Sequence, residues 1–436
     1  MPTRRRAGIA WMAGAAGALL VAACRTATPG TSAAPAAAAA PAEGGRWWKG
    51  NLHTHSLWSD GDGFPEMIAD WYRERGYHFL ALTDHNVMPD GERWFTVPEA
   101  LGGALEAYRA RFGGDWVAER RRGDTVQVRL RTHAEYAPRL EQPGRFLLLP
   151  SEEITQYVGR VAVHVNGINL AAAVPEQRGD AALDVLQRDV DAVAAQRAST
   201  GRPMLAAVNH PNFVYSLVAA DLARLRGGRF FEVYNAHPLV NNAGDSLHPA
   251  TERLWDIALA ERLSNGGELL YGTATDDAHD YHRVGTRFRN PGRAWVMVRA
   301  DSLTPAALVA ALERGDFYAS TGVVLEAVER SARRVALRIR PEPGVRYVTR
   351  FVGTRRDFDR RATPVRDSLG RALTPRYGPD VGAVLAEVEG TAPSYEPRGD
   401  ELYVRAVVTS SRPQGNPATE GEVEQAWVQP IVVARP

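Results

Sequence analysis

The stretch HFLALTDHN, residues 78–86, is an apolar run that ends in an aspartate, a histidine and an asparagine. Similar runs follow it along the chain: RFLLLPSEEIT (145–155), VAVHVNGINL (161–170), PMLAAVNHPNF (203–213), RFFEVYNAHP (229–238) and ELLYGTATDDAH (268–279). Short continuous apolar runs are typical of strands buried on both faces, as in a parallel sheet. Sites in such sheets form where the strands end, so we expect the polar residues after each run to share one face.

Amphipathic segments lie between the apolar runs, and their ends carry helix signals. A helix is predicted over 64–76, with a proline near its start, and another over 182–201 that stops at Gly201. A third is predicted within 303–317, where Thr304 is the N-cap and a proline follows it. Strands that alternate with helices indicate an α/β domain.

Two segments depart from this pattern. From about 88 to 142 the chain is rich in Arg and Glu, which we interpret as an insertion: either a helical lid beside the site or a solvated excursion without a role. Residues 321–436 are predicted to form a small β-sandwich, because apolar and polar residues alternate in RVALRIRP (334–341), VRYVTRFVGT (345–354), ELYVRAVVTS (401–410) and QAWVQPIVVA (425–434). The last histidine is His282, so the predicted chemistry precedes this domain.

The N-terminal segment has the features of an export signal. Three arginines precede an apolar run from Ala7 to Ala23, which ends at Cys24, the one cysteine of the sequence. The sequence VAAC (21–24) resembles a bacterial lipobox, in which the cysteine is lipidated, so we predict a signal peptide with lipobox over 1–24 and an exported, membrane-anchored lipoprotein on the periplasmic or cell-surface side. A plain secretory signal or a membrane-spanning helix are the alternatives. Residues 25–45, rich in Ala and Pro, predict a linker.

The bulk composition gives little reason to expect a polyanionic partner. The chain has 436 residues, 44% hydrophobic and 24% charged, with a formal net charge of +1. This balance is that of an ordinary globular protein of two or three domains. We therefore expect no nucleic-acid polymer as a partner.

The segment GNLHTHSLWSDGDG (50–63) suggests a metal site, because imidazoles at i and i+2 point the same way on an extended strand. Further histidines and carboxylates stand at the ends of the later runs. The candidate metal ligands are His53, His55, Asp60, His85, Glu153, His164, His210, Asp277 and His279. So many ionisable groups at one end of a sheet need a counter-charge, and a mixed His and carboxylate set suits Zn, Mn or Fe rather than Ca or Mg.

The motifs NLHTHSLWSDG, LALTDHN, LLLPSEEIT, HVNGINL, VNHPNF and GTATDDAH resemble, in this order, those of the PHP (polymerase and histidinol phosphatase) superfamily. The resemblance extends from Trp47 to Tyr318. It implies a metal-dependent phosphoesterase and a distorted (β/α)7 barrel over 46–320. It does not specify the substrate.

The resemblance also implies two or three divalent ions with assigned ligands. The ligand groups it implies, one for each ion in turn, are His53, His55 and Asp277; His164 and His210; and Asp60, His85 and His279. Glu153 is expected to bridge the first two ions, and it is chosen over Glu152 because it stands third after the proline. Asp84 is expected to orient His85 from behind.

The expected mechanism needs no serine or cysteine nucleophile, and the sequence has no GxSxG motif. A hydroxide shared by two divalent ions is a nucleophile at neutral pH, and the same ions neutralise phosphate oxygens. The residues expected to take part in catalysis are Asp60, His279, His282 and Arg283, the last two as anion-binding groups. Further candidates for anion binding are Asn86, Asn209 and His237.

The predicted function is hydrolysis of a small phosphorylated metabolite outside the cytoplasm, with neither the substrate nor the oligomeric state specified. An amidohydrolase-like metallohydrolase is one alternative. In binuclear members of that class a modified lysine bridges the metals, whereas the corresponding stretch here, PSEEI (150–154), has no lysine. A metal-binding cell-surface protein without catalytic activity is the other alternative.

Overall fold

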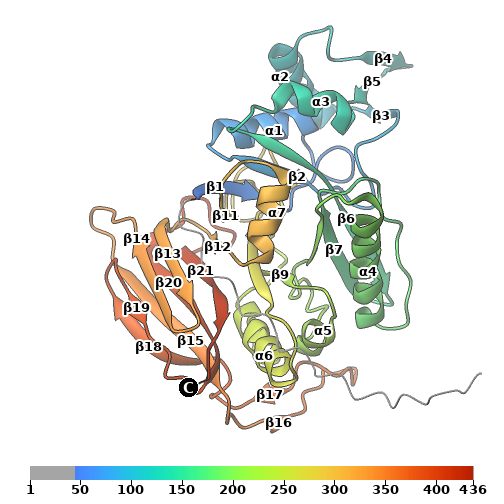
Figure 1. Cartoon of the computed structure of the whole chain (residues 1–436). Coiled ribbons are helices and arrows are strands. Elements are labelled where there is room, and N and C mark those ends of the chain that lie inside the picture. The colour runs from blue at the N-terminus through green and yellow to red at the C-terminus, as the bar shows by residue number, and fades with distance from the viewer. Residues whose placement is uncertain (1–44, 436) are drawn as a thin grey trace, which may run out of the picture. The chain divides into compact units, whose positions relative to one another are not determined.

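The computed structural model describes residues 45–435, and a single 13-stranded sheet runs through most of them, in the order β10-β9-β8-β7-β6-β2-β1-β11-β12-β21-β20-β15-β18 (Figure 1). The strands of this sheet are β1 (Arg46–Asn51), β2 (Phe79–Leu82), β6 (Leu147–Val158), β7 (Val161–Ile168), β8 (Leu205–Val208), β9 (Phe230–Asn235), β10 (Tyr271–Thr275), β11 (Trp295–Ala300), β12 (Phe317–Ser320), β15 (Tyr347–Arg355), β18 (Ala383–Glu389), β20 (Glu401–Pro413) and β21 (Val423–Val432).

The part of the sheet from β10 to β1 confirms the predicted α/β class, but it is not a closed (β/α)7 barrel. β1, β2 and β6 pair in parallel, as do β8, β9 and β10. β7 runs antiparallel to both β6 and β8. The segments after β1 and β10 meet at the isolated bridge between Thr54 and Ala278, without a ladder.

The reversal of β7 has a local cause. Only two residues, Gly159 and Arg160, separate β6 from β7, and Gly159 has a φ of 61°. A two-residue connection makes a hairpin, whereas a parallel partner needs a crossover of a dozen or more residues. The expectation that every apolar run is a parallel strand was therefore wrong for 161–170.

The three predicted helices are present as α1 (Pro65–Glu74), α4 (Ala182–Thr200) and α7 (Pro305–Glu313). α4 ends at Gly201, whose φ of 69° is the left-handed conformation that glycine adopts without strain. The Thr304 side chain accepts a hydrogen bond from the backbone N–H of Ala307 at 3.2 Å, as an N-cap does. Two further helices, α5 (Ala219–Arg224) and α6 (Thr251–Ser264), lie against one another.

Residues 88–142 form a packed layer around α1 rather than a solvated excursion. Their elements are β3 (Arg93–Thr96), a 3-10 turn (Glu99–Leu101), α2 (Gly102–Phe112), β4 (Glu119–Arg122), β5 (Thr125–Leu130) and α3 (His133–Leu140). The strands pair in the order β3-β5-β4. The carboxylate of Glu66, on α1, is buried and accepts hydrogen bonds from the hydroxyl of Tyr108 at 2.7 Å and from Nε1 of Trp116 at 2.9 Å.

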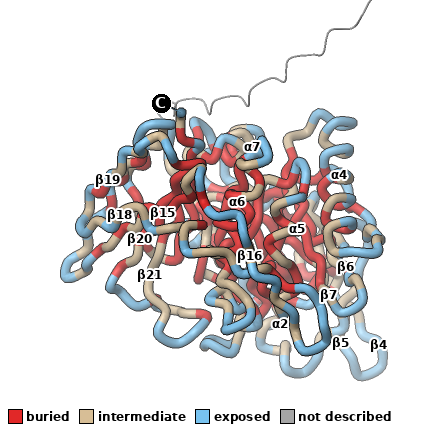
Figure 2. Tube along the Cα trace, turned by 90° about the horizontal axis from the view of Figure 1, so that it is seen from below, coloured by how far each residue is buried: buried red, intermediate tan, exposed pale blue. Residues whose placement is uncertain are grey.

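The C-terminal strands continue the main sheet, because β12 pairs with β21. A second sheet of β13 (Leu325–Ser331), β14 (Arg334–Ile339) and β19 (Ser394–Tyr395) shares an apolar core with β15, β20 and β21. The short strands β16 (Ala362–Thr363) and β17 (Arg376–Tyr377) pair beside α6 (Figure 1). Buried residues lie in the interior of the α/β part and of the C-terminal strands, and exposed residues lie mainly at the edges of the molecule (Figure 2).

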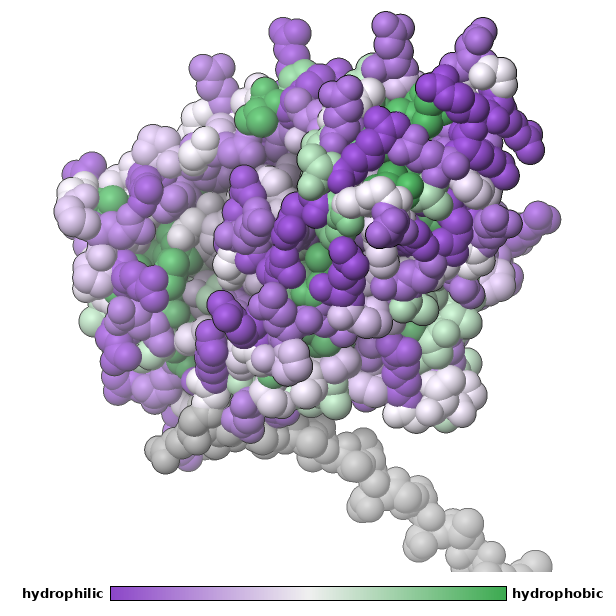
Figure 3. Space-filling view, turned by 90° about the horizontal axis from the view of Figure 1, so that it is seen from above, coloured by the Kyte–Doolittle hydropathy of each residue, from purple (hydrophilic) through white to green (hydrophobic). Residues whose placement is uncertain are grey.

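The predicted signal peptide, lipobox and nearly all of the predicted linker lie in residues 1–44, outside the described part of the chain. Between residues 45 and 435, no helix combines the length and the hydrophobicity needed to cross a membrane. The face seen in Figure 3 is mostly hydrophilic, with hydrophobic residues in small separate patches.

Candidate metal centre

The nine side chains predicted as metal ligands lie together in the structure. Their nitrogen and carboxylate-oxygen atoms form four overlapping groups, and within each group these atoms lie within 4.8 Å of one another. The groups are His53, His55 and Glu153; His53, His210 and Asp277; His85, Glu153 and His164; and His55, Asp60, His85 and His279. Each group has the size and donor types of a site for one ion.

His53 and His55 follow β1 in an extended segment, so that both rings point into the cluster. The Nε2 atoms of the two rings lie 3.1 Å apart. Backbone contacts hold the segment on both sides: the N–H of His53 donates to the side-chain oxygen of Asn51 at 2.8 Å, and the N–H of His55 donates to the carbonyl of Ala278 at 2.9 Å. Burial, together with the neighbouring His279, lowers the pKa of His55 to about 3, which keeps it in the neutral form that binds metals.

Glu153 lies within β6 at the centre of the cluster. Its Oε1 is 3.0 Å from Nδ1 of His164 and 3.4 Å from Nε2 of His210, whereas its Oε2 is 2.7 Å from Nδ1 of His85. Burial alone would raise the pKa of Glu153, but the surrounding histidines, led by His164, hold it well below its usual value. The two oxygens of one carboxylate thus face different histidines.

His164 reaches the cluster from the middle of β7 rather than from the end of a strand. The hairpin register places it opposite Thr155, two residues from Glu153. Nε2 of His164 is buried and makes no hydrogen bond among the described residues. Buried polar atoms are rarely left unpaired, and a divalent ion would satisfy this nitrogen, so the residues fit a metal site.

Asp277 follows β10 in a strained conformation, with a φ of 48°. Its Oδ1 lies 3.1 Å from Nε2 of His55 and 3.3 Å from Nε2 of His53. A non-glycine residue in the left-handed region costs about 1 to 3 kcal/mol and persists where surrounding contacts fix it. Here the N–H of Asp277 donates to the carbonyl of His53 at 3.0 Å, and Oδ2 accepts from the side-chain amide of Asn235 at 3.1 Å.

The third predicted group is the most exposed part of the cluster. The side chain of Asp60 is 51% exposed, and its Oδ1 lies 3.3 Å from Nε2 of His279 and 3.6 Å from Nε2 of His85. The ring of His279 stacks on that of His55, with centroids 4.0 Å apart. An ion held here would therefore be the one nearest to solvent.

The structure corrects the role expected of Asp84. Its carboxylate accepts hydrogen bonds from the N–H and hydroxyl of Ser56, at 2.8 and 2.7 Å, and from the hydroxyl of Ser59 at 2.6 Å. Nδ1 of His85 instead lies 2.7 Å from the hydroxyl of Thr155. Asp84 therefore fixes the loop that carries Asp60 rather than the ring of His85.

His282 and Arg283, expected to bind the substrate anion, have other partners. Nε2 of His282 lies 3.0 Å from the carbonyl of Asp62, and the guanidinium of Arg283 donates to Asp280 at 3.0 Å. Arg289 also donates to Asp280, from Nε at 2.8 Å, but it is the arginine beside the cluster, since its Nη1 lies 4.0 Å from Oδ2 of Asp60. It was missed because it stands ten positions after His279, in a loop without a recognisable motif.

Of the other anion-binding candidates, two are occupied by internal contacts. The side-chain amide of Asn209 donates to Glu153 at 2.6 Å, and that of Asn86 donates to the carbonyl of Thr155 at 2.7 Å. His237 is different. Its Nδ1 accepts from the N–H of Leu239 at 3.1 Å, which leaves the proton of the neutral ring on Nε2, and burial lowers its pKa to about 4.

Glu232 is part of the centre, although it was not predicted. Its Oε1 lies 2.7 Å from Nδ1 of His53, and its Oε2 accepts from the N–H of His210 at 2.7 Å and from the amide of Asn235 at 2.8 Å. A carboxylate that fixes the free ring nitrogen of a metal-binding histidine is a recurrent feature of such sites. The sequence shows only a glutamate inside the apolar run RFFEVYN (229–235), and the structure shows that this strand is fully buried.

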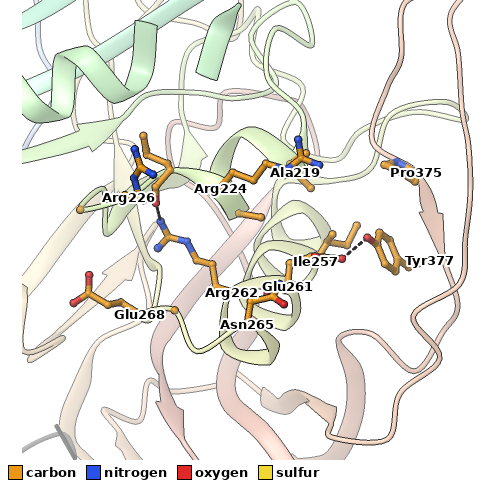
Figure 4. A pocket seen from close by; sticks show the side chains of 15 residues that line it. Ala219, Arg224, Arg226, Ile257, Glu261, Arg262, Asn265, Glu268, Pro375 and Tyr377 are labelled. Carbon is orange, nitrogen blue, oxygen red and sulfur yellow. Dashed lines mark hydrogen bonds between the residues drawn. The ribbon is translucent and has the colours of Figure 1, made fainter. Parts of the chain in front are cut away.

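The cavity of about 560 Å³ drawn in Figure 4 is separate from this cluster and is lined by none of its nine side chains. It lies between α5, α6 and the segment around Tyr377, whose hydroxyl donates to Glu261 at 2.6 Å. Its lining includes Arg224, Arg226 and Arg262 (Figure 4).

No family model and no curated protein matches the sequence. Among solved structures, the chain is similar to a two-domain protein from Bacteroides vulgatus that contains a predicted PHP-like metal-dependent phosphoesterase, at 15% identity and a TM-score of 0.38, over 92% of this chain and 100% of that one. An amidohydrolase from Chromobacterium violaceum, with bound sulfate and no metal, is similar at 14% identity and a TM-score of 0.29, over 53% and 88% of the two chains.

A protein from Bifidobacterium adolescentis named as a metal-dependent phosphoesterase is similar at 15% identity and a TM-score of 0.27, over 55% of this chain and 89% of that one. The structural neighbours are PHP-like phosphoesterases and an amidohydrolase. The TM-scores of these three structures are below 0.5, so the functional proposal rests on the site itself.

Proposed function

We propose that the protein is a metal-dependent phosphoesterase that hydrolyses a small phosphate ester. The observation that carries this proposal is the position of Glu153, whose Oε1 faces His164 and His210 while its Oε2 faces His85. A carboxylate placed between two sets of histidines is suited to bridge two ions. Pairs of divalent ions are a recurrent solution for displacement at phosphorus.

The residues of the centre would have separate roles in metal binding and in phosphate binding. His53, His55, Glu153 and Asp277 would hold the ions in the buried part of the centre. When bound, such ions lower the pKa of water and neutralise phosphate oxygens. Arg289 and the Nε2–H of the neutral His237 are the donors placed to orient a phosphate group, since both belong to the wall of the cluster.

An amidohydrolase with a modified bridging lysine is disfavoured by the position of the single lysine in the sequence, Lys49. Its ammonium lies over the rings of Tyr77 and Trp295, at 4.0 and 3.7 Å from their centroids, and not among the candidate ligands. The carboxylate of Glu153 occupies the place between the histidines instead. We therefore do not propose lactone or amide hydrolysis, and the assay tests for it by including lactones and amides.

We also propose that the mature chain is exported and held at a membrane by a lipid on Cys24. The lipobox-like sequence and the following Ala/Pro-rich segment support this proposal. Labelling with a radioactive fatty acid in a bacterial host tests it, with Cys24→Ala as the unlabelled control. Label of equal strength in both proteins would refute the lipid anchor.

The activity is tested with purified protein of residues 25–436, loaded with Mn²⁺ or Zn²⁺, on a panel of phosphomonoesters, phosphodiesters, lactones and amides. We expect the native protein to hydrolyse the phosphate esters. The rate of hydrolysis should be at least about a hundredfold lower in His55→Ala. His78→Ala is the matched control, because His78 lies outside the four ligand groups. Turnover of lactones or amides alone would overturn the proposal, and absence of any turnover with metal bound would favour a binding protein.

A further inference from the structure

Four largely apolar side chains stand on the elements that carry metal ligands. They are Tyr157, Phe213, Val214 and Leu239, which we call the apolar wall: the rings of Tyr157 and Phe213 lie against ligand histidines, and Val214 and Leu239 belong to the loops that carry Phe213 and His237. The exposed fractions of three of these side chains are 62% for Tyr157, 58% for Val214 and 63% for Leu239. Exposed side chains of this size beside a polar site are the kind of patch that binds ligands.

Phe213 joins this wall to the metal ligands. Its ring centroid lies 5.1 Å from that of His210, 6.2 Å from that of His164 and 5.8 Å from that of His237. The ring of Tyr157 meets His164 edge-on at 5.9 Å. A group bound against the apolar wall would therefore touch the side chains that surround the reaction centre.

Two loops with the same turn carry Phe213, Val214 and Leu239, whereas Tyr157 lies on β6. In each, a His-Pro pair follows a strand, and the N–H three residues after the histidine donates to the histidine carbonyl: Phe213 to His210 at 2.8 Å and Val240 to His237 at 2.9 Å. The loops follow the neighbouring parallel strands β8 and β9, and they are joined by the bridge between Phe213 and Val240. Residues 211–220 and 236–244 contain no Asp, Glu, Lys or Arg, in a chain whose charged content is 24%.

The first loop is held in a strained conformation. Val214 and Tyr215 have φ values of 44° and 53°, and a β-branched residue in this region is a genuine outlier. The ring of Tyr215 stacks on His248 with centroids 3.7 Å apart, and its carbonyl accepts from Arg371 at 3.2 Å. Strain maintained by such contacts is typical of functional sites.

We propose that the apolar wall binds the organic group of the substrate, and that the substrate is an ester whose alcohol carries an aromatic or branched aliphatic group. This inference rests on the proposed phosphoesterase function. Arg289 lies near Asp60, whereas Phe213 and Tyr157 lie against His164 and His210, so the phosphate and the organic group of one molecule would contact different side chains. An ester of a polyol would leave the apolar wall in water.

The test compares benzyl phosphate with glycerol 1-phosphate on the metal-loaded protein, because both esters have an alkyl alcohol as leaving group. We expect kcat/KM to be about tenfold higher for benzyl phosphate, and Leu239→Ser to lower the ratio of the two values about fivefold. Val214→Asn, which tolerates the positive φ, is the second variant and should act in the same direction. Val384→Ser is the control, since Val384 is 52% exposed but lies on β18.

Binding of benzylphosphonate and methylphosphonate to the same proteins gives a measurement that does not depend on turnover. A preference for benzylphosphonate that Leu239→Ser removes supports the apolar wall even if no phosphate ester is cleaved, in which case only the proposed function fails. Equal values for the two phosphonates, or hydrolysis without preference for the benzyl ester, overturn the inference. The inference is also overturned if the native protein is a dimer that Leu239→Ser dissociates, and neither protein prefers one phosphonate. The apolar wall would then be an interface between two copies of the chain.

Discussion

Nδ1 of His53 lies 2.7 Å from Oε1 of Glu232, and both side chains are buried. Burial alone would lower the pKa of His53, but Asp277, Glu232 and Glu153 together hold it well above its usual value. The carboxylate of Glu232 therefore fixes the ring and leaves Nε2 directed at the other ligands. This contact joins the segment that follows β1 to β9, two parts of the chain that are far apart in the sequence.

Replacing Glu232 should weaken the centre without removing a ligand. We expect Glu232→Gln to reduce the affinity for metal about tenfold to a hundredfold, because the amide cannot hold the His53 ring as a carboxylate does. Isothermal titration calorimetry with the metal ion measures the affinity of both proteins. Glu268→Gln, at an exposed side chain, is the control, and equal affinity in Glu232→Gln and the native protein would contradict the role of Glu232.

Removal of metal should destabilise the fold. The carboxylates of Glu153 and Asp277 are buried, and without an ion only the surrounding histidines compensate their charge. A free metal concentration a hundred times Kd should raise the free energy of unfolding by about 2.7 kcal/mol. Thermal unfolding with and without a chelator tests this. The shift should be absent in His53→Ala; a shift of equal size there would place the bound metal elsewhere.

The number of ions should depend on Asp60. Asp60 belongs only to the exposed group with His55, His85 and His279, so Asp60→Asn should remove one ion per chain and leave the others. Elemental analysis of the purified variant counts the ions directly. Asp124→Asn, in the exposed turn between β4 and β5, should not change the count. A native protein with no ion at this group would show the same count in both variants and refute the third site.

Stability should fall as the pH rises, in part because of Asp189 on α4. Burial, with Glu152 nearby, raises its pKa to about 8, and its carboxylate accepts from the amide of Gln156 at 2.5 Å. A carboxyl whose pKa is higher in the folded than in the unfolded state keeps its proton on folding, so its contribution is present below pH 4 and is lost as the pH rises to 8. Relative to the native protein, Asp189→Asn should gain about 1 to 3 kcal/mol between pH 5 and pH 8.

Urea unfolding at the two pH values measures this difference. The asparagine oxygen can still accept from Gln156, so the substitution removes the charge and keeps the contact. Parallel loss of stability in both proteins would show that Asp189 is not the group responsible.

The C-terminal strands should unfold in one cooperative step with the α/β part of the chain. Arg405, on β20, is buried and donates to Asp256 on α6 at 2.7 Å and to Glu252 at 3.1 Å. We expect Arg405→Met to destabilise the whole protein by about 3 to 5 kcal/mol, because it leaves the Asp256 carboxylate buried without its partner. Arg361→Met, whose guanidinium is exposed, is the control. A two-step unfolding curve would indicate that the strands fold independently.

The sequence predicted most of the cluster because metal ligands are polar residues in apolar surroundings. His53, His55 and Asp277 were visible as polar residues at the ends of apolar runs. Glu232 was not predicted, because a single glutamate within a strand has no neighbour in the sequence that shows what it faces. The partners of His282 and Arg283 likewise depend on a loop fold that no motif encodes.

What the sequence by itself determined was the α/β class, the helices with their caps, and the side chains able to bind metal, because these follow from local periodicity and residue chemistry. Only the tertiary structure decided that β7 is reversed, that Arg289 rather than Arg283 lies beside Asp60, and that the loops carrying Phe213 and Leu239 lie side by side through the bridge between Phe213 and Val240. The physical reason is that contacts between distant segments depend on the pairing of strands and the packing of loops. Neither of these leaves a periodic signal in the chain.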